Sequence, residues 1–290
     1  MPRRWSPSPV MSASLCLHGL GAAGLAAEPA AWPQLLGALA CNHALLACGM
    51  HPRSGMLGRN LTRLPGRGVR GVAITFDDGP HPEVTPRVLD ILDTCGARAT
   101  FFVIGERAAR HASLVREIVR RGHAVENHTQ RHPVDFATWG PWRLRREIAE
   151  AQQAIADASG RLPRYFRAPM GLRSPLLDPV LVLEGLSLVS WTRRGYDTVS
   201  RRPELILRRL TRGLADGDIL LLHDATAKAD GDGVPVVLTV LPRLIERIAA
   251  AGLRTATLLD GEVPTGGRDA SGAMRAGAAA PACPVPGGHA

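Results

Sequence analysis

Residues 71–103 have the sequence GVAITFDDGPHPEVTPRVLDILDTCGARATFFV, in which two β-branched or aromatic runs flank a helix-like segment. The runs are Val72–Phe76 and Ala99–Val103, which are short and apolar as buried strands are. Between them, Val84–Thr94 has apolar residues at helical spacing and is followed by Gly96, a common helix stop. The pattern predicts a strand, a helix and a strand in succession.

The same alternation continues along the chain as far as residue 257. Seven strands are predicted, at Val72–Phe76, Ala99–Val103, His123–Asn127, Arg164–Arg167, Ser187–Trp191, Asp218–Leu222 and Arg254–Thr257. The helices predicted between them are Val84–Thr94, Ser113–Arg121, Pro141–Ala158, Leu176–Glu184, Pro203–Leu214 and Val236–Ala250. Regular alternation predicts an α/β fold with a parallel sheet and helices outside it.

The polar residues that stand out follow or end strands at their C-terminal ends. They are Asp77, Asp78, His128, Arg167, Asp197 and His223. An α/β barrel builds its active site from the C-terminal ends of many different strands, whereas an open sheet concentrates its site at one switch point. We therefore expect a deformed (β/α) barrel of about seven parallel strands.

The chain divides into three zones by composition. Residues 1–65 contain two uncharged apolar stretches, Val10–Ala27 and Trp32–Met50, each close to the about 20 residues that cross a bilayer. They predict an apolar helical hairpin that is membrane-associated, although their few polar residues also fit a soluble hairpin. Residues 66–261 are the predicted barrel domain, and the Gly, Ala and Pro-rich residues 262–290 are predicted to be a disordered tail.

Composition argues against nucleic-acid binding. The net charge is +9, but residues 1–70 hold seven arginines and one glutamate, so most of the excess lies in the N-terminal zone. Lys228 is the only lysine and aromatic residues make up 4% of the chain, so no basic and aromatic surface is expected. The five cysteines lack CxxC spacing, which favours buried free thiols over a zinc knuckle or a disulfide framework.

Two motifs carry residues that could bind a divalent metal. Asp77 and Asp78 precede Gly79-Pro80, a combination that by itself is typical of a polar turn. His128 and His132 are four residues apart, so on a helical turn both imidazoles would point the same way. Two histidines and one carboxylate leave metal positions open for water and substrate, and the second carboxylate could act as a base on that water.

Two further motifs supply groups suited to amide hydrolysis. Arg167 begins the sequence Arg-Ala-Pro-Met-Gly, where the arginine could hold a carboxylate and an exposed backbone N–H could face an oxyanion. His223 follows the apolar run Leu220–Leu222. It is either a hydrogen-bonded histidine at the end of a buried strand or an acid for a leaving amine.

In this order and at these separations, the motifs TFDDGP, HTQRH, RAPMG and LLLH resemble those of the polysaccharide deacetylases of the NodB-homology type, carbohydrate esterase family 4. The resemblance covers about residues 66–260. It implies a deformed (β/α) barrel that hydrolyses N-acetyl or other N-acyl groups on amino sugars. It also implies one divalent metal ion, expected to be zinc, with cobalt, nickel and manganese as alternatives.

The resemblance implies a role for each matching residue. Asp77 falls on the catalytic base, Arg167 on the residue that pairs with the base, and His223 on the general acid. The implied metal ligands are Asp78, His128 and His132.

One family motif, typically Asp-x-x-Asp-Trp after the fifth strand, is altered. Counting from Trp191, Arg194 stands at the first Asp position and Thr198 replaces the tryptophan. Asp197 keeps the second Asp position and is expected to orient His223. The alteration bears on substrate specificity more than on metal chemistry.

The residues predicted to line the substrate site are Met170, Trp191 and Tyr196. Met170 stands where the family usually has an aromatic residue, so the subsite is expected to be less suited to stacking a sugar ring. Core packing is the alternative role for Trp191.

The sequence thus predicts a metal-dependent hydrolase that removes N-acetyl or N-acyl groups from amino sugars of a poly-, oligo- or lipid-linked saccharide and releases a free amine and acetate. One alternative is a non-catalytic carbohydrate-binding relative. Another is a hydrolase of a different amide, such as an N-formyl sugar or a cyclic imide. The expected partners are the acylated amino sugar and a membrane, and the pattern does not indicate an oligomeric state.

We expect residues 1–50 to attach the enzyme to a membrane, in bacteria the inner membrane, with the barrel on the cytoplasmic side. Arg3 and Arg4 precede the hairpin and further arginines follow it, so basic residues flank the hairpin on one side. A cleaved signal sequence with a site near Gly24-Leu25-Ala26 is the main alternative, and Trp32–Met50 would then remain as an anchor. The cell-wall substrates usual in the family favour a barrel outside the cytoplasm.

Overall fold

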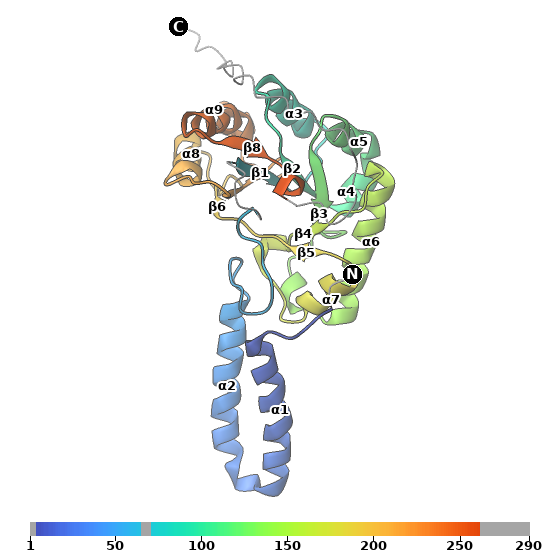
Figure 1. The fold of residues 1–290 in the computed structure, drawn as a ribbon, viewed down its shortest axis with the longest axis vertical. Helices are drawn as coiled ribbons and strands as arrows, with labels where there is room; N and C mark the ends of the chain where they lie inside the picture. The colour runs from blue at the N-terminus through green and yellow to red at the C-terminus, as the bar shows by residue number, and fades with distance from the viewer. Residues whose placement is uncertain (1–3, 65–70, 262–290) are drawn as a thin grey trace, which may run out of the picture.

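The computed structural model describes residues 4–64 and 71–261. The predicted tail, residues 262–290, lies outside the described residues, as does the predicted boundary at residue 65. The structure consists of an α/β domain from which a pair of helices projects (Figure 1).

The α/β domain is built on one sheet in which every strand pairing is parallel. Its strands are β1 (Gly71–Asp77), β2 (Thr100–Val103), β3 (Ala124–Asn127), β4 (Tyr165–Phe166), β5 (Ser187–Leu188), β6 (Arg193–Arg194), β7 (Ile219–His223) and β8 (Arg254–Ala256). The order across the sheet is β5-β4-β3-β2-β1-β7-β6, with β8 also paired to β1. All seven predicted strands are present, the fifth only as the two residues of β5, and β6 (Arg193–Arg194) is an additional strand that was not predicted.

The sheet curls into an incomplete barrel. The two ends of its strand order, β5 and β6, belong to one stretch of chain, residues 187–194, so the sheet bends back toward itself. Residues Leu61 to Leu64 help to close the remaining side: the N–H of Leu61 donates to Leu188 O over 2.9 Å, and that of Leu64 donates to Gly217 O over 2.8 Å. The expected deformed barrel of about seven parallel strands is confirmed.

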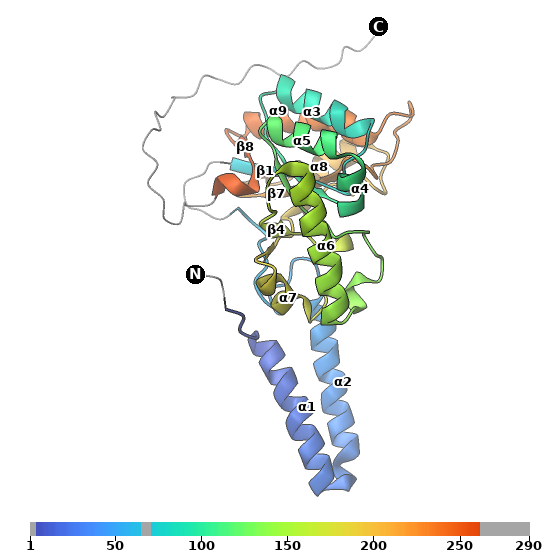
Figure 2. The same cartoon turned by 90° about the vertical axis from the view of Figure 1, so that its right-hand side faces the viewer.

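Helices cover the outside of this curled sheet (Figures 1 and 2). They are α3 (Val84–Thr94), α4 (Gly105–Arg110), α5 (Ala112–Arg120), α6 (Pro141–Ser159), α7 (Leu177–Leu183), α8 (Pro203–Thr211) and α9 (Val236–Ala250). Short 3-10 turns lie at η1 (Pro29–Ala31), η2 (Phe136–Thr138), η3 (Pro169–Gly171) and η4 (Leu258–Gly261). The predicted helices agree with these, except that Gly105–Arg110 was not predicted.

Alternate residues of the central strands point to opposite sides of the sheet, because side chains alternate along a strand. On β7, Leu220 and Leu222 pack outward in the large cluster that includes the helices, whereas Leu221 packs inward with Phe102 and Trp191. Both sides are apolar, which is why these strands are continuous hydrophobic runs in the sequence. The site residues Asp77 and His223 stand at the C-terminal ends of β1 and β7, beyond these apolar runs.

The N-terminal helices form the predicted apolar hairpin. Helix α1 (Pro9–Ala27) and helix α2 (Trp32–Gly49) lie side by side and extend away from the barrel (Figures 1 and 2). Asn42 donates a hydrogen bond to Ser14 Oγ over 3.0 Å in the buried seam between them. Among the helices in the described part of the chain, α1 alone is long and apolar enough to cross a membrane.

The cysteines differ from expectation. Cys16, Cys41 and Cys48 are free but exposed on the hairpin, and Cys95 is buried and disulfide-bonded. The prediction that the cysteines are buried free thiols is therefore wrong for these four residues.

Candidate metal and catalytic site

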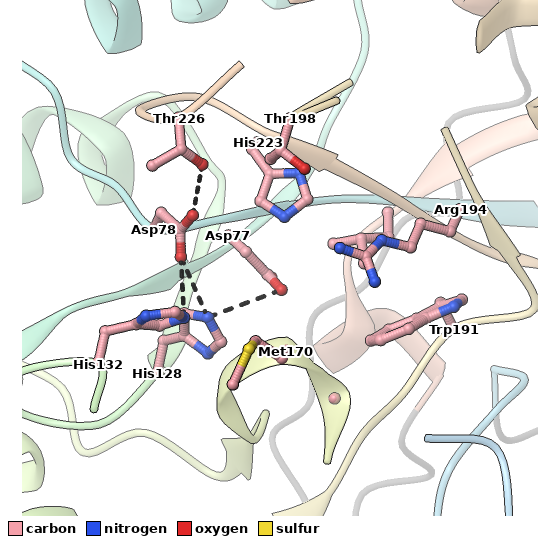
Figure 3. Close-up of a pocket in the computed structure, with 12 residues that line it drawn as sticks. Asp77, Asp78, His128, His132, Met170, Trp191, Arg194, Thr198, His223 and Thr226 are labelled. Carbon is pink, nitrogen blue, oxygen red and sulfur yellow. Dashed lines mark hydrogen bonds and ion pairs between the residues drawn. The ribbon is translucent and has the colours of Figure 1, made fainter. Parts of the chain in front are cut away.

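A pocket of about 280 Å³ opens at the C-terminal ends of the strands. Asp77 ends β1, His128 follows β3, and His223 ends β7. Figure 3 shows these side chains converging on one space from different strands. The placement agrees with the barrel geometry expected from the sequence.

Asp78, His128 and His132 form the candidate metal centre. One donor atom from each lies within 4.8 Å of the others. Asp78 Oδ1 is 3.4 Å from His128 Nε2 and 3.3 Å from His132 Nε2 (Figure 3). The same oxygen is buried and has no hydrogen-bond partner among the described residues. An unpartnered carboxylate oxygen between two imidazoles is a donor set that fits a divalent cation.

The backbone around the histidines positions both rings, but not as a helix. His128 Nδ1 lies 2.8 Å from Arg167 O, so Nε2 is the atom directed into the site. Residues 128–132 form a loop in which Thr129 (φ 68°) and His132 (φ 57°) are left-handed. The predicted helical turn is therefore wrong, and a hydrogen bond from His132 N to Thr129 Oγ1 (2.9 Å) holds the loop instead.

The electrostatics of the centre favour cation binding. Burial alone would raise the pKa of Asp78, but its contact with His128 and the charges of His128, His223 and His132 hold it well below its usual range. Burial, with the charge of His128, lowers the pKa of His132. Although burial opposes it, the charges of Asp77 and Asp78 raise the pKa of His128, so a metal would displace that proton.

Asp77 is paired with a buried arginine. Arg167 Nη1 donates to Asp77 Oδ1 over 2.6 Å and to Thr75 Oγ1 over 2.9 Å, while Nη2 donates to Ser190 O over 2.9 Å. These bonds hold one oxygen of Asp77 and leave Oδ2 on the side of the metal centre, 3.8 Å from His128 Nε2.

Asp197 holds both the ring and the backbone of His223. Asp197 Oδ1 lies 2.9 Å from His223 Nδ1, and Asp197 Oδ2 accepts the backbone N–H of His223 over 2.7 Å. Burial lowers the pKa of His223, but the charge and hydrogen bond of Asp197 outweigh it and raise the pKa overall. The pair is buried, with the imidazole at the pocket wall.

The predicted substrate-site residues are only partly brought together. Met170 and Trp191 line the pocket, and Trp191 also packs in the barrel interior. Tyr196 does not line it; its side chain is 47% exposed, and its ring centre is 5.0 Å from the guanidinium carbon of Arg194 and 5.2 Å from that of Arg209.

Sequence reasoning missed Thr226. Its hydroxyl donates to Asp78 Oδ2 over 2.5 Å and lines the pocket. The only signal was its place three residues after His223, in a loop that follows a strand end. Arg194 and Thr198, noted in the sequence as departures from the family motif, also line the pocket.

Comparisons with known proteins agree with this architecture. The family model described as polysaccharide deacetylase matches residues 66–187. The chain is 39% identical to a chitooligosaccharide deacetylase of Bradyrhizobium sp. (strain ANU 289) over 54% of this chain and 72% of that protein. It is 35% identical to a chitooligosaccharide deacetylase of Sinorhizobium fredii over 64% of this chain and 89% of that protein.

A solved structure extends the comparison. The family 4 carbohydrate esterase from Streptomyces lividans, in complex with acetate, superposes with a TM-score of 0.58 and 35% identity over 64% of this chain and 91% of that chain.

Fold and site together define a barrel hydrolase of the NodB-homology type. The chain belongs to the polysaccharide deacetylase family, carbohydrate esterase family 4, and is a hydrolase that acts on carbon–nitrogen bonds in linear amides.

Proposed function

We propose that the protein is a metal-dependent deacetylase that hydrolyses the N-acetyl group of amino sugars in an oligo-, poly- or lipid-linked saccharide. The observation that carries the proposal is the convergence on one pocket of one three-residue cluster and two ion pairs. They are the Asp78 and histidine cluster, the Asp77–Arg167 pair and the His223–Asp197 pair. The names of the two rhizobial relatives support N-acetylated chitooligosaccharides as the first substrate class to test.

Asp78, His128 and His132 would hold the metal, for which zinc is our proposal because two imidazoles and a carboxylate suit that ion. The bound ion would polarise the amide carbonyl and acidify water. The chain contributes the orientation of its ligands: Arg167 O fixes His128, and Thr226 holds the second oxygen of Asp78.

Asp77 is the proposed general base. Arg167 donates to Oδ1 and orients the carboxylate, while Oδ2 remains to accept a proton from the attacking water. Arg167 does not touch the reacting atoms and is a positioning residue. It is fully buried beside Phe102, with its guanidinium carbon 4.0 Å from the ring centre, so its geometry is fixed.

His223 is the proposed general acid. Asp197 holds Nδ1, which leaves Nε2 for the substrate, and the charge of Asp197 raises the pKa of the imidazole, which favours its acid form. As water adds to the carbonyl, the backbone N–H of Met170 at the pocket wall supports the developing oxyanion. The carbon–nitrogen bond then breaks, the nitrogen takes the proton of His223, and acetate and a free amine leave.

We also propose that the hairpin attaches the enzyme to a membrane. Helix α1 has the length and composition of a span, and its large apolar residues Leu15 and Leu20 are exposed. Exposed leucines on a helix that extends away from the domain are typical of a lipid-facing surface.

Paired asparagine variants test the deacetylase proposal. Metal-loaded protein should release acetate from N-acetylchitooligosaccharides, and formate release from an N-formyl sugar is followed in parallel. Asp77→Asn should keep its metal and lose 10²- to 10⁴-fold in rate, because only the base is removed. Asp78→Asn should lose both metal and activity. A metal-replete Asp77→Asn protein with near-normal turnover would show that the mechanism is wrong.

A further inference from the structure

Arg194 places a positive charge in the wall of the candidate site. It ends β6, lines the pocket and is half-buried. In Figure 3 its guanidinium points toward Asp77. The family motif has an aspartate at this position, so the pocket wall carries a positive charge here where the motif would place a negative one.

The neighbours of Arg194 orient it without neutralising it. Its guanidinium carbon lies 5.4 Å from the ring centre of Trp191 and 5.0 Å from that of Tyr196. Aromatic faces attract a guanidinium but carry no net charge. In the part of the chain that the structure describes, Arg194 forms no ion pair, and its Nε is buried without a hydrogen-bond partner.

The carboxylates of the site already have other partners. Asp77 is paired with Arg167, and Asp197 is paired with His223. Asp78 lies between two imidazoles and accepts from Thr226. A half-buried cation with no internal counter-ion is best satisfied by an anion that enters with the ligand.

We propose that Arg194 binds an anionic group, a phosphate or a carboxylate, on the amino-sugar substrate, and so selects charged saccharides over neutral ones. The inference rests on the proposed deacetylation and names its substrate class. A guanidinium suits this role because it donates two parallel N–H bonds to a phosphate or carboxylate.

The rest of the pocket wall supports recognition through charge. Met170 and Thr198 both line the pocket and stand where the family pattern has aromatic residues. An aliphatic residue and a small polar residue offer a sugar ring less area for stacking than aromatic rings would. A charged contact at Arg194 compensates for the lost stacking.

The phosphate could be carried by a soluble sugar or by a lipid. The position of the hairpin makes the second source accessible. Pro52, three residues after α2, lies against Gly171 of η3. The two residues are so close that a Cβ added to Gly171 would lie 2.9 Å from Pro52, and it would also collide with Trp191. Gly171 and Trp191 both line the pocket, so the site opens beside the segment that leaves the hairpin.

The test compares matched substrates and matched arginine variants. The neutral substrate is di-N-acetylchitobiose. The charged substrates are its 1-phosphate, the same disaccharide linked through diphosphate to a polyprenol in vesicles, and the disaccharide of N-acetylglucosamine and N-acetylmuramic acid. Arg194→Gln is compared with Arg209→Gln, which removes the same charge from an exposed residue that also contacts the Tyr196 ring but does not line the pocket.

We expect the wild-type full-length holoenzyme to prefer at least one anionic substrate by roughly 10-fold or more in kcat/KM. Which one it prefers identifies the source of the anion. Arg194→Gln should bring the ratio of charged to neutral kcat/KM close to one, whereas Arg209→Gln should keep the wild-type ratio. Equal rates on charged and neutral substrates in the wild type, or an unchanged ratio in Arg194→Gln, would overturn the proposal.

Binding separates this proposal from the proposed reaction. In the metal-loaded Asp77→Asn protein, calorimetry should detect the disaccharide 1-phosphate, and adding Arg194→Gln should weaken its affinity roughly 10- to 100-fold. That loss without any acetate release from the wild type would support the anion site and reject the deacetylase. Identical affinity with and without Arg194 would reject the anion site even if acetate is released.

Discussion

Each carboxylate of the site has a different neighbour, and the neighbour determines what the carboxylate can do. Arg167 pairs with Asp77, the proposed base; two imidazoles flank Asp78, the proposed metal ligand; and Asp197 pairs with His223. Adjacent residues of one strand end therefore acquire separate functions, because side chains at successive positions meet different surroundings.

Thr226 should control metal affinity. Its hydroxyl holds Asp78 Oδ2, so Asp78 Oδ1 is the oxygen that faces both histidines. Thr226→Val keeps the shape and removes the hydroxyl, and should weaken metal binding roughly 10- to 100-fold. Thr226→Ser is the control and should stay close to the wild type. Competition with a chromogenic chelator measures both, and equal affinity in Thr226→Val would exclude the role.

Asp197 should set the alkaline limit of activity. In the proposed mechanism the acid form of His223 is the active one, so kcat should fall as the pH rises through its pKa, which Asp197 raises. Asp197→Asn removes that charge and lowers the pKa of His223, so the alkaline limb should move to lower pH. Asp157→Asn, on the exposed face of α6, should not move it. A pH–rate profile with an unchanged limb in Asp197→Asn would assign the general acid to another group.

At the scale of elements, the site depends on the turns that follow the strands. Asp78 (φ 72°) follows β1, His132 (φ 57°) lies in the loop after β3, and Met170 (φ 56°) lies in η3 after β4. A left-handed backbone conformation costs free energy at any residue other than glycine. Residues that adopt it cluster where the backbone must direct a side chain into a functional site. The strands supply a rigid base, and these turns direct the groups into the pocket.

Gly171 in η3 should be needed for packing as well as for its backbone angle. Its φ is 76°, and an added Cβ would collide with Trp191 and lie 2.9 Å from Pro52. Gly160 has nearly the same φ (74°) with nothing within 4 Å, which makes it a matched control. Gly160→Ala should lower the free energy of unfolding by about 1 kcal/mol, from backbone strain alone. Gly171→Ala should lower it by roughly 1–3 kcal/mol more, from overpacking. Denaturant unfolding that gives equal losses would contradict the role of packing.

The whole molecule combines a catalytic barrel with a projecting hairpin. The segment after α2 connects them: Arg173 donates to Met50 O through its N–H and to Ser54 O through Nη1, and Asn60 donates to Pro52 O. These contacts fix the base of the hairpin beside the pocket. The substrate pocket is thereby kept near any surface into which the hairpin inserts.

Membrane attachment should depend on the exposed apolar face of α1. Leu20→Glu, at a residue that is 74% exposed on α1, should release the full-length chain into the soluble fraction. Leu162→Glu is the control, at a residue of the barrel that is 70% exposed, and should stay with the membrane. Recovery of the wild-type chain in the soluble fraction would reject attachment.

The side of the membrane remains a separate prediction. A reporter that is active only outside the cytoplasm, fused to the C-terminus, should be silent, because the arginines before and after the hairpin favour the cytoplasmic side. Strong reporter activity would place the barrel outside. The disulfide at Cys95 would then form in the oxidising compartment where such bonds are usual.

The sequence by itself determined the elements and the identity of most groups at the site. Strand and helix periodicities are local, so runs such as Val72–Phe76 and Val84–Thr94 could be recognised without tertiary contacts. Because parallel strands end on one face, Asp78 and His128 could be expected to meet.

Tertiary structure alone decided how those groups are aimed. His128 and His132 converge through a left-handed loop rather than a helical turn, since hydrogen bonds from distant or non-helical positions outweigh helical spacing. Tyr196 does not line the pocket and contacts two arginines instead, while Arg194 and Thr226 line it. Such placements depend on contacts between residues far apart in the chain, such as Thr226 with Asp78, which no local pattern encodes.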